Sequence, residues 1–138
     1  MIAATIILLI FFINKLWTTD PMVNMINQYR QIYYIGALTT DPRLVASATQ
    51  KACNLYYTDQ FAHITADGKT PWDYFKENDY EYDYAGENLA RDMTSNEQAF
   101  VKLAESKTHR ENMLNMNFQD IGIGRCGNVI VQHFGKTS

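Results

Sequence analysis

Apolar positions recur at helical spacing most clearly between Pro42 and about Tyr57. One face of a helix over this range carries only apolar side chains: Leu44, Val45, Ala48, Ala52, Leu55 and Tyr56. Asp41-Pro42 supplies an N-cap residue followed by a proline at the first helical position, which is a typical start signal. The pattern therefore predicts an amphipathic helix that buries this face against the rest of the domain.

Shorter patterns predict further helices, most of them with a recognisable start. Asp20-Pro21 is another pair of N-cap residue and proline, Thr70-Pro71 is a third, and Thr94 to Glu97 form a capping box. The helices expected from these signals and from the apolar pattern cover about residues 21–35, 72–77, 97–106 and 109–114.

Strands are expected only in the middle and at the end of the chain. Tyr84 to Ala90 predicts a short strand, whereas Ile121 to Arg125 and Val129 to Phe134 flank a turn at Gly127-Asn128 and predict a hairpin. Helices around one strand and a terminal hairpin favour an α+β fold, in which helices cover a small antiparallel sheet.

The N-terminal segment is set apart by an apolar run from Ile2 to Ile13, interrupted only by Thr5. As a helix this run would span about 18 Å, which is short of the roughly 30 Å hydrocarbon core of a bilayer. The length suits the h-region of a secretory signal, although no Lys or Arg precedes the run and no small-x-small cleavage site follows it. An uncleaved membrane anchor is an equal alternative, and a helix docked on the domain is a third. We therefore separate residues 1–19, as signal peptide or anchor, from a domain at 20–138.

Composition narrows the possible functions. The chain has 138 residues, of which 46% are hydrophobic and 20% charged, and this suits one globular domain. Its net charge is −3 and it has no basic stripe, which argues against nucleic acid as a partner because phosphate binding needs clustered Lys and Arg. We expect a secreted or extracytoplasmic monomer whose partner is a protein, a lipid or a cell-envelope ligand. Contact with a membrane is expected only through the N-terminal segment.

Glu87 is the main candidate for chemistry. Its carboxylate lies between Gly86 and Asn88 with apolar residues on both sides, and a buried charge in such a place needs partners. The chain offers His63 before it and His109 after it. Two imidazoles and one carboxylate with an open water position make the minimal catalytic type of zinc site. Neither a His-Glu-x-x-His helix nor a nucleophile-elbow pattern is present.

A series of short motifs resembles one known family. The motifs are Ile26 to Arg30, Leu38 to Leu44, Phe61 to His63, Asp67 to Pro71, Tyr84 to Ala90, Ser106 to Leu114, Phe118 to Gly124 and Val131 to Gly135. In this order they resemble the CAP superfamily of cysteine-rich secretory proteins, antigen 5 and pathogenesis-related proteins, and specifically its compact bacterial branch of SCP-domain proteins. The resemblance covers nearly everything after the N-terminal segment.

The resemblance implies a three-layer α-β-α sandwich with a cleft on one side. In many family members the cleft holds two histidines and two glutamates, and some members bind zinc or another divalent cation there. Carried over by motif, these residues are His63, His109 and Glu87. The second glutamate of the family falls at Ser106, one residue after Glu105, and one residue on a helix turns a side chain by about 100°. Glu105 is nevertheless the fourth candidate metal ligand.

The stretch before His109 departs from the family in two ways. Leu103 stands where relatives have a tryptophan, and Ser106 to His109 replaces the usual Ser-Pro-Gly-His, which removes the turn formers. An unbroken helix through this stretch would place Glu105 and His109 at i and i+4 on one face.

Two functions are compatible with these residues. The first is a non-enzymatic binding module, with no catalytic residue, whose cleft holds a divalent cation or a small ligand. The second is a metal-dependent hydrolase that uses Glu87 as general base on a metal-bound water. In a purely structural interpretation, His63, Glu87 and His109 form a hydrogen-bonded cluster that fixes the packing of the cleft.

The cysteines and the last histidine complete the expectations. Cys53 and Cys126 permit one disulfide in an exported domain, which would stabilise it by a few kcal/mol, and two free thiols are the alternative. We expect His133 to be an exposed residue of the final strand.

Overall fold

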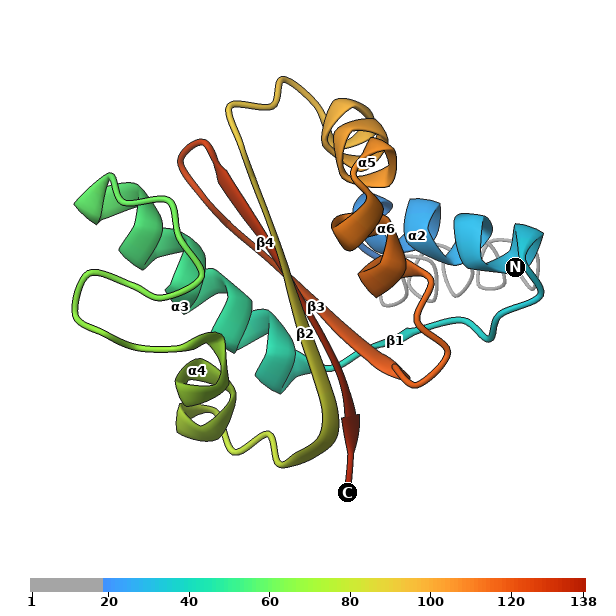
Figure 1. The fold of residues 1–138 in the computed structure, drawn as a ribbon, viewed down its shortest axis with the longest axis horizontal. Coiled ribbons are helices and arrows are strands. Elements are labelled where there is room, and N and C mark those ends of the chain that lie inside the picture. The colour runs from blue at the N-terminus through green and yellow to red at the C-terminus, as the bar shows by residue number, and fades with distance from the viewer. Residues whose placement is uncertain (1–18) are drawn as a thin grey trace, which may run out of the picture.

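The computed structural model describes residues 19–138, so the expectations for the N-terminal segment lie outside the described range. None of the helices in this part of the chain is long and apolar enough to cross a membrane. The elements, in chain order, are α2 (Pro21–Ile32), β1 (Thr39–Thr40), α3 (Pro42–Thr58), α4 (Pro71–Glu77), β2 (Tyr82–Arg91), α5 (Asn96–Glu105), α6 (Lys107–Met113), β3 (Asp120–Cys126) and β4 (Val129–Thr137) (Figure 1).

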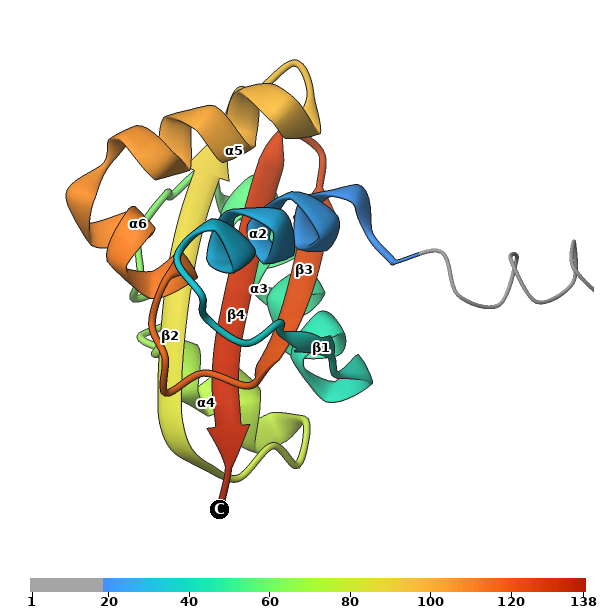
Figure 2. The ribbon, with the colours of Figure 1, turned by 90° about the vertical axis from the view of Figure 1, so that its right-hand side faces the viewer.

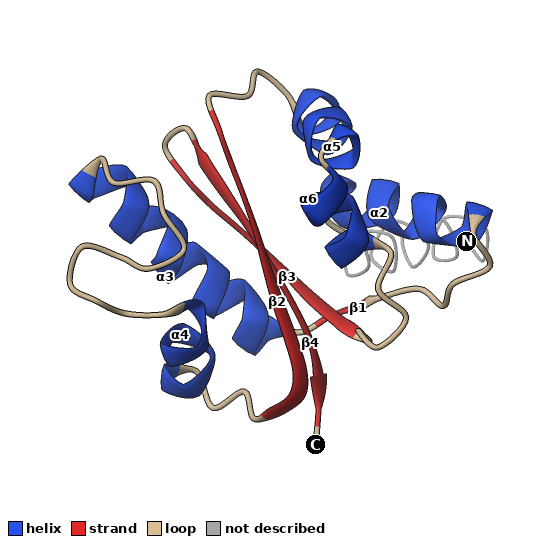
Figure 3. Cartoon of the chain, in the orientation of Figure 1, coloured by secondary structure: helices blue, strands red, loops and turns tan. Residues whose placement is uncertain are grey.

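The sheet lies between two groups of helices and has the strand order β1-β3-β4-β2 (Figure 3). α3 and α4 cover one face, and α2, α5 and α6 cover the other, which faces the viewer in Figure 2. The predicted three-layer α+β sandwich is therefore confirmed, with β2, β4 and β3 antiparallel. The two-residue strand β1 pairs in parallel with β3 and was not predicted, because Thr39-Thr40 carries no apolar alternation.

Helix α3 lies so close to β3 that only glycine fits beneath it. A Cβ atom built on Gly122 would lie 2.1 Å from the backbone carbon of Leu44, and one on Gly124 would lie 2.1 Å from that of Ala48. The close approach buries most of the predicted face of α3, namely Leu44, Ala48, Ala52 and Leu55. Val45 is half-buried and Tyr56 is exposed, so the two ends of the predicted face differ from the expectation. These two glycines thus set the distance between the helix and the sheet.

The predicted start signals act as helix caps. The side chain of Asp20 accepts a hydrogen bond from the backbone N–H of Met22 at 2.9 Å, and Asp41 accepts one from Arg43 at 2.8 Å. At α5 the cap lies one residue later than predicted, because Ser95 accepts the hydrogen bond from the backbone N–H of Gln98.

A buried guanidinium fastens two loops together. Arg30 is 1% exposed, and its guanidinium donates to backbone carbonyls on both loops. The carbonyl of Gly36, after α2, lies 2.7 Å away, and that of Asn115, between α6 and β3, lies 2.9 Å away. Bonds to the carbonyls of Met113 and Phe118 complete the set. The loop after α2 is therefore held beside the loop after α6.

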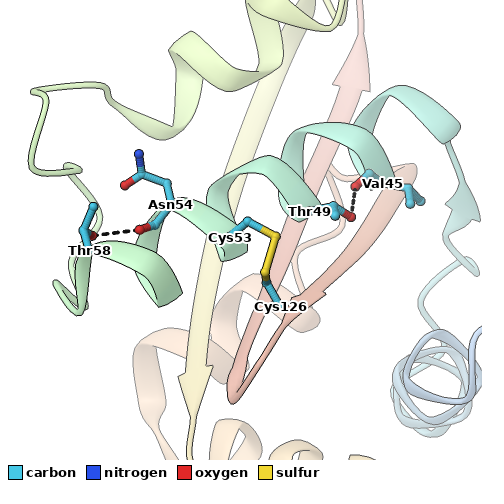
Figure 4. Close-up of a disulfide and its surroundings, with 6 residues drawn as sticks. All are labelled: Val45, Thr49, Cys53, Asn54, Thr58 and Cys126. Atoms are coloured by element: carbon cyan, nitrogen blue, oxygen red, sulfur yellow. Dashed lines mark hydrogen bonds between the residues drawn. A yellow bond between two sulfur atoms is a disulfide. The ribbon is translucent and has the colours of Figure 1, made fainter.

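The two cysteines are paired. Cys53 on α3 and Cys126 at the end of β3 form a disulfide with their Cα atoms 4.9 Å apart (Figure 4). Cys126 follows Gly122 and Gly124 at alternate positions, so it lies on the face of β3 that meets α3. Of the two alternatives that the sequence left open, the structure has the disulfide.

Replacing both Cys53 and Cys126 by serine should lower the free energy of unfolding by about 2–4 kcal/mol, because the bond joins residues 73 apart in sequence and restricts the unfolded chain. Urea denaturation of the oxidised protein and of the double variant measures the difference. Reducing the wild-type protein should give the same loss, and a double variant as stable as the oxidised protein would contradict the pairing.

Candidate functional site

Glu87 lies in the middle of β2, on the face of the sheet that meets α3. It pairs in register with His133 on the neighbouring strand β4. Both residues are buried, with Glu87 6% exposed and His133 fully covered. His63 reaches the same place from the loop between α3 and α4, and Lys51 reaches it from α3.

Both oxygens of the Glu87 carboxylate already have partners. His63 Nδ1 lies 2.7 Å from Oε1 and His133 Nε2 lies 2.8 Å from Oε2. Lys51 Nζ is 4.0 Å from Oε1. Burial alone would raise the pKa of the carboxyl group, but the two imidazole hydrogen bonds and the nearby ammonium hold it below its ordinary value. The group is therefore a carboxylate at neutral pH.

His133 is buried, so the expectation of an exposed residue is wrong. Its ring lies 4.7 Å from that of Phe75, and its Nδ1 lies 2.7 Å from Ser47 Oγ. Burial lowers the pKa of this imidazole, and a neutral ring fits its partners if Nε2–H donates to Glu87 while Nδ1 accepts from Ser47. The error arose because β4 is an inner strand with helices on both faces, and such a strand has no exposed side.

Lys51 is a member of the cluster that was not predicted. Its side chain is fully buried, its ammonium donates to the backbone carbonyl of His63, and the ring centroid of Tyr74 lies 5.6 Å away. Burial lowers its pKa, which the charge of Glu87 partly offsets. The sequence feature that could have predicted Lys51 was its spacing of four residues from Ser47. This spacing places both polar side chains on one side of α3.

His63 and His109 lie at the outer side of this cluster. The His63 side chain is 60% exposed, and its hydrogen bond to Glu87 raises its pKa. The pKa of His109 is lowered by burial and then by the charge of His63, so the two imidazoles lie within electrostatic range of each other.

An asparagine pair holds His109 on α6 beside β2. Asn88 Nδ2 donates to the backbone carbonyl of His109 at 3.0 Å, and Asn112 Nδ2 donates to Asn88 Oδ1 at 2.8 Å. Within the described residues, no hydrogen bond joins the His109 ring to Glu87. The structure therefore brings His63 and Glu87 into contact, and it brings His109 near without bonding it to the carboxylate.

Glu105 lies outside the cluster. Its side chain is 62% exposed and its Oε2 is 3.3 Å from Lys102 Nζ. Ser106 ends α5 and starts α6 with an extended ψ of 123°, so the unbroken helix that would have aligned Glu105 with His109 is not formed. Leu103, in the place of the family tryptophan, is buried in the core beneath α2 and α5.

The expected set of metal donors is not assembled in the described part of the chain. No group of three or more His, Cys, Asp or Glu side chains in residues 19–138 is arranged to hold a metal ion. The carboxylate of Glu87 is taken up by two imidazoles, and Glu105 points elsewhere. The residues present do not fit a zinc centre with three or four protein ligands.

An open groove of about 470 Å³ lies over the cluster. It is lined by His63, Ile64, Thr70, Pro71, Trp72, Ala85, Gly86, Glu87 and Asn112. Two apolar walls, Ile64 and Trp72, are 59% and 39% exposed, and the floor is polar. A larger hollow of about 760 Å³ beyond Trp72 contains neither imidazole nor Glu87. The smaller groove is therefore the candidate binding site.

Nearly the whole domain is similar to known proteins. Residues 23–133 match the model of the cysteine-rich secretory protein family. The uncharacterized protein YkwD of Bacillus subtilis is 31% identical over 115 residues, which make up 82% of this chain and 45% of YkwD. The chain thus spans less than half the length of that relative.

Solved structures show the same fold at low identity. An extracellular protein containing a SCP domain from Bacillus anthracis has a TM-score of 0.82 at 22% identity, over 84% of this chain and 39% of its own. An outer surface protein of Borrelia burgdorferi has a TM-score of 0.79 at 23% identity, over 85% of this chain and 90% of its own.

The imidazole of His63 should have a higher pKa than those of His109 and His133. We expect His63 to titrate above 6.5 because of its bond to Glu87, and His109 and His133 to titrate below 6.5 because of burial. NMR signals of the ring protons over a pH series measure this order. Glu87→Gln should lower the pKa of His63, and a His63 that titrates below His109 in the wild-type protein would contradict the bond.

The same pKa shifts determine whether each histidine stabilises the protein more at low pH or at high pH. Folding raises the pKa of His63. Its contribution to the free energy of unfolding is therefore complete below pH 6.5 and is lost as the pH rises through the pKa of His63 in the folded protein. Folding lowers the pKa of His133, so the free energy of unfolding decreases as the pH falls below 6.5, where the imidazole of the unfolded chain takes up a proton.

Lys51→Met should destabilise the protein by about 3–5 kcal/mol, because it leaves the buried carboxylate of Glu87 without its cation. The double variant Lys51→Met/Glu87→Gln should lose less than the sum of the two single variants in urea denaturation. Lys69→Met, which removes a partly exposed lysine paired with Glu77, is the control and should change little. Strictly additive losses would show that Lys51 and Glu87 do not interact.

Proposed function

Because the chain belongs to the cysteine-rich secretory protein family, we propose that it is an extracytoplasmic binding module and not an enzyme. Its binding site is the groove above Glu87, and its ligand is a small molecule or a divalent cation that contacts His63. The observation that carries this proposal is the pairing of both Glu87 oxygens with imidazoles, one buried at His133 and one exposed at His63.

The pairing of Glu87 disfavours the alternative, a metal-dependent hydrolase. A general base needs a pKa near the working pH and an oxygen that can take up the proton of a bound water. The pKa of Glu87 is held low, and its oxygens accept hydrogen bonds from His63 and His133. The carboxylate is therefore a weak base in a position where its protonation would break the cluster.

A cation at the groove would depend on His63, which lines the groove, and on His109, which lies outside the lining but within electrostatic range of His63. His63 Nδ1 faces Glu87, which leaves Nε2 as the ring nitrogen available to a ligand. A carboxylate behind an imidazole orients that imidazole for metal binding without contacting the metal. In this proposal Glu87 orients His63, while His63 and His109 supply the protein donors and Glu105 takes no part. Two donors support exchangeable binding of zinc or a similar ion.

Several features support an extracytoplasmic location. A disulfide persists in an oxidising compartment and is rare in reducing ones. The apolar run at residues 2–13 suits an export signal or anchor. The structural relatives from Bacillus anthracis and Borrelia burgdorferi are described as extracellular and as an outer surface protein.

Zinc loading followed by dialysis tests the proposed site. We expect the wild-type protein to take up at most about one zinc ion per chain and to lose it on dialysis, because a site with two protein ligands is open to exchange. Elemental analysis should show no uptake in His63→Ala or His109→Ala, and unchanged uptake in the control Glu105→Gln.

The opposite pattern would support the hydrolase. Zinc that survives dialysis and is lost in both Glu87→Gln and Glu105→Gln would require a closed centre built on the two carboxylates. If zinc does not bind at all, the small-molecule site is tested separately with fragments, whose binding should shift the NMR signal of the Trp72 indole N–H at the wall of the groove.

A further inference from the structure

A group of exposed apolar side chains stands at one end of the molecule, away from the groove. Ile32 is the last residue of α2, and Tyr33 and Tyr34 follow it; the three residues are 70%, 54% and 99% exposed. Met116, on the loop between α6 and β3, is 80% exposed. We call these four residues the apolar tip.

The tip is one surface built from the end of α2 with the loop that follows it and from the loop after α6. The guanidinium of Arg30 bonds the carbonyl of Gly36 on one loop and that of Asn115 on the other. Because a single buried side chain holds both loops, their exposed residues lie on the same end of the domain. Figure 2 shows the two loops side by side below α2 and α6.

Tyr34 occupies a backbone position that normally belongs to glycine. Its φ is 57°, and the backbone N–H groups of Tyr34 and Ile35 bond the carbonyls of Gln31 and Arg30, each at 3.0 Å. This is the glycine position of a Schellman motif, where a residue with a Cβ costs about 1 kcal/mol or more. A side chain that is 99% exposed makes no contact among residues 19–138 that would offset this cost. Such an uncompensated residue points to an external binding partner.

The two segments that carry the tip contain no charged residue. Residues 31–40 and 112–119 contain no Asp, Glu, Lys or Arg, in a chain in which 20% of the residues are charged. The one charged residue of α2, Arg30, is buried, and the exposed positions of the helix include Asn24, Gln28 and Gln31. Charged side chains are costly in a bilayer, whereas Tyr and apolar residues are favoured at its interface.

We propose that the apolar tip inserts into the interface of a lipid bilayer and holds the domain against the membrane with the uncharged side of α2 facing the lipid. The net charge of −3 and the lack of exposed cations at the tip favour neutral phosphatidylcholine-type headgroups over anionic ones. The groove takes no part in this contact, so the inference does not depend on the proposed function.

The length of the chain before α2 is compatible with this contact. The apolar run ends at Ile13, and the residues at 14–19 can extend over about 20 Å. α2 has 12 residues and is about 18 Å long, and the tip lies at its far end. A bilayer that holds the apolar run is therefore within reach of the tip as well.

A fluorescent label placed at the tip tests the contact directly. Both native cysteines are paired, so Tyr34→Cys in the full chain can be labelled alone with an environment-sensitive dye. The matched control is Tyr57→Cys, because Tyr57 is 79% exposed at the end of α3 in the other helical layer. With phosphatidylcholine vesicles we expect a blue shift and a loss of iodide quenching at position 34 alone. Equal quenching at positions 34 and 57 would overturn the proposal and assign the tip to a protein partner.

Tyr34→Gly separates the membrane contact from a role in folding. Glycine relieves the backbone strain, so this variant should be more stable than the wild-type protein in urea. A dye on Met116→Cys in the Tyr34→Gly background should lose its protection from iodide on phosphatidylcholine vesicles, and this readout reports on the tip and not on the apolar run at residues 2–13. A variant that is more stable and keeps this protection would overturn the membrane contact. A variant that is less stable would overturn the argument from strain.

Discussion

The carboxylate of Glu87 is buried as a charge between two imidazoles and an ammonium, and this arrangement joins parts of the chain that are far apart in sequence. Lys51 and Ser47 come from α3, His133 from β4 and His63 from the loop that follows α3. A charge removed from water is tolerated only when its partners are held in place, so the position of each element depends on the others. The network also determines the shape of the groove, because it positions His63 and Glu87, which form the floor of the groove.

The same hydrogen bonds limit the chemistry that the groove can perform. A carboxylate held ionised by two imidazoles and an ammonium orients neighbouring groups well, but it is poorly suited to take up a proton. The imidazole of His63 benefits from this arrangement, because one ring nitrogen is fixed and the other remains available. Binding through His63 leaves the network intact, whereas catalysis by Glu87 would disrupt it. This difference is the physical basis for preferring a binding module to a hydrolase.

The sequence predicted the parts of the structure that local rules govern. The caps at Asp20 and Asp41, the apolar face of α3 and the turn between β3 and β4 all depend on residues a few positions apart. The contact between His63 and Glu87 followed from the family motifs. Lys51 and His133 were missed because their burial depends on which strand is central and which helix lies across it. The disulfide was undecided for the same reason, since it requires α3 to cross β3 at Gly122 and Gly124.

Two places in the domain depart from what stability alone would favour, and the contrast between them is informative. The charges of Glu87 and Lys51 are costly to bury, yet both groups have hydrogen-bond partners inside the domain. Tyr34 holds a strained backbone conformation, and its exposed ring has no partner in the part of the chain that the structure describes. The cost of the buried charges is offset by their partners within the fold. The strain at Tyr34 has no such compensation, which points to a binding partner outside the domain. The uncharged loops on either side of Arg30 indicate that this outside partner is apolar, which a bilayer interface provides.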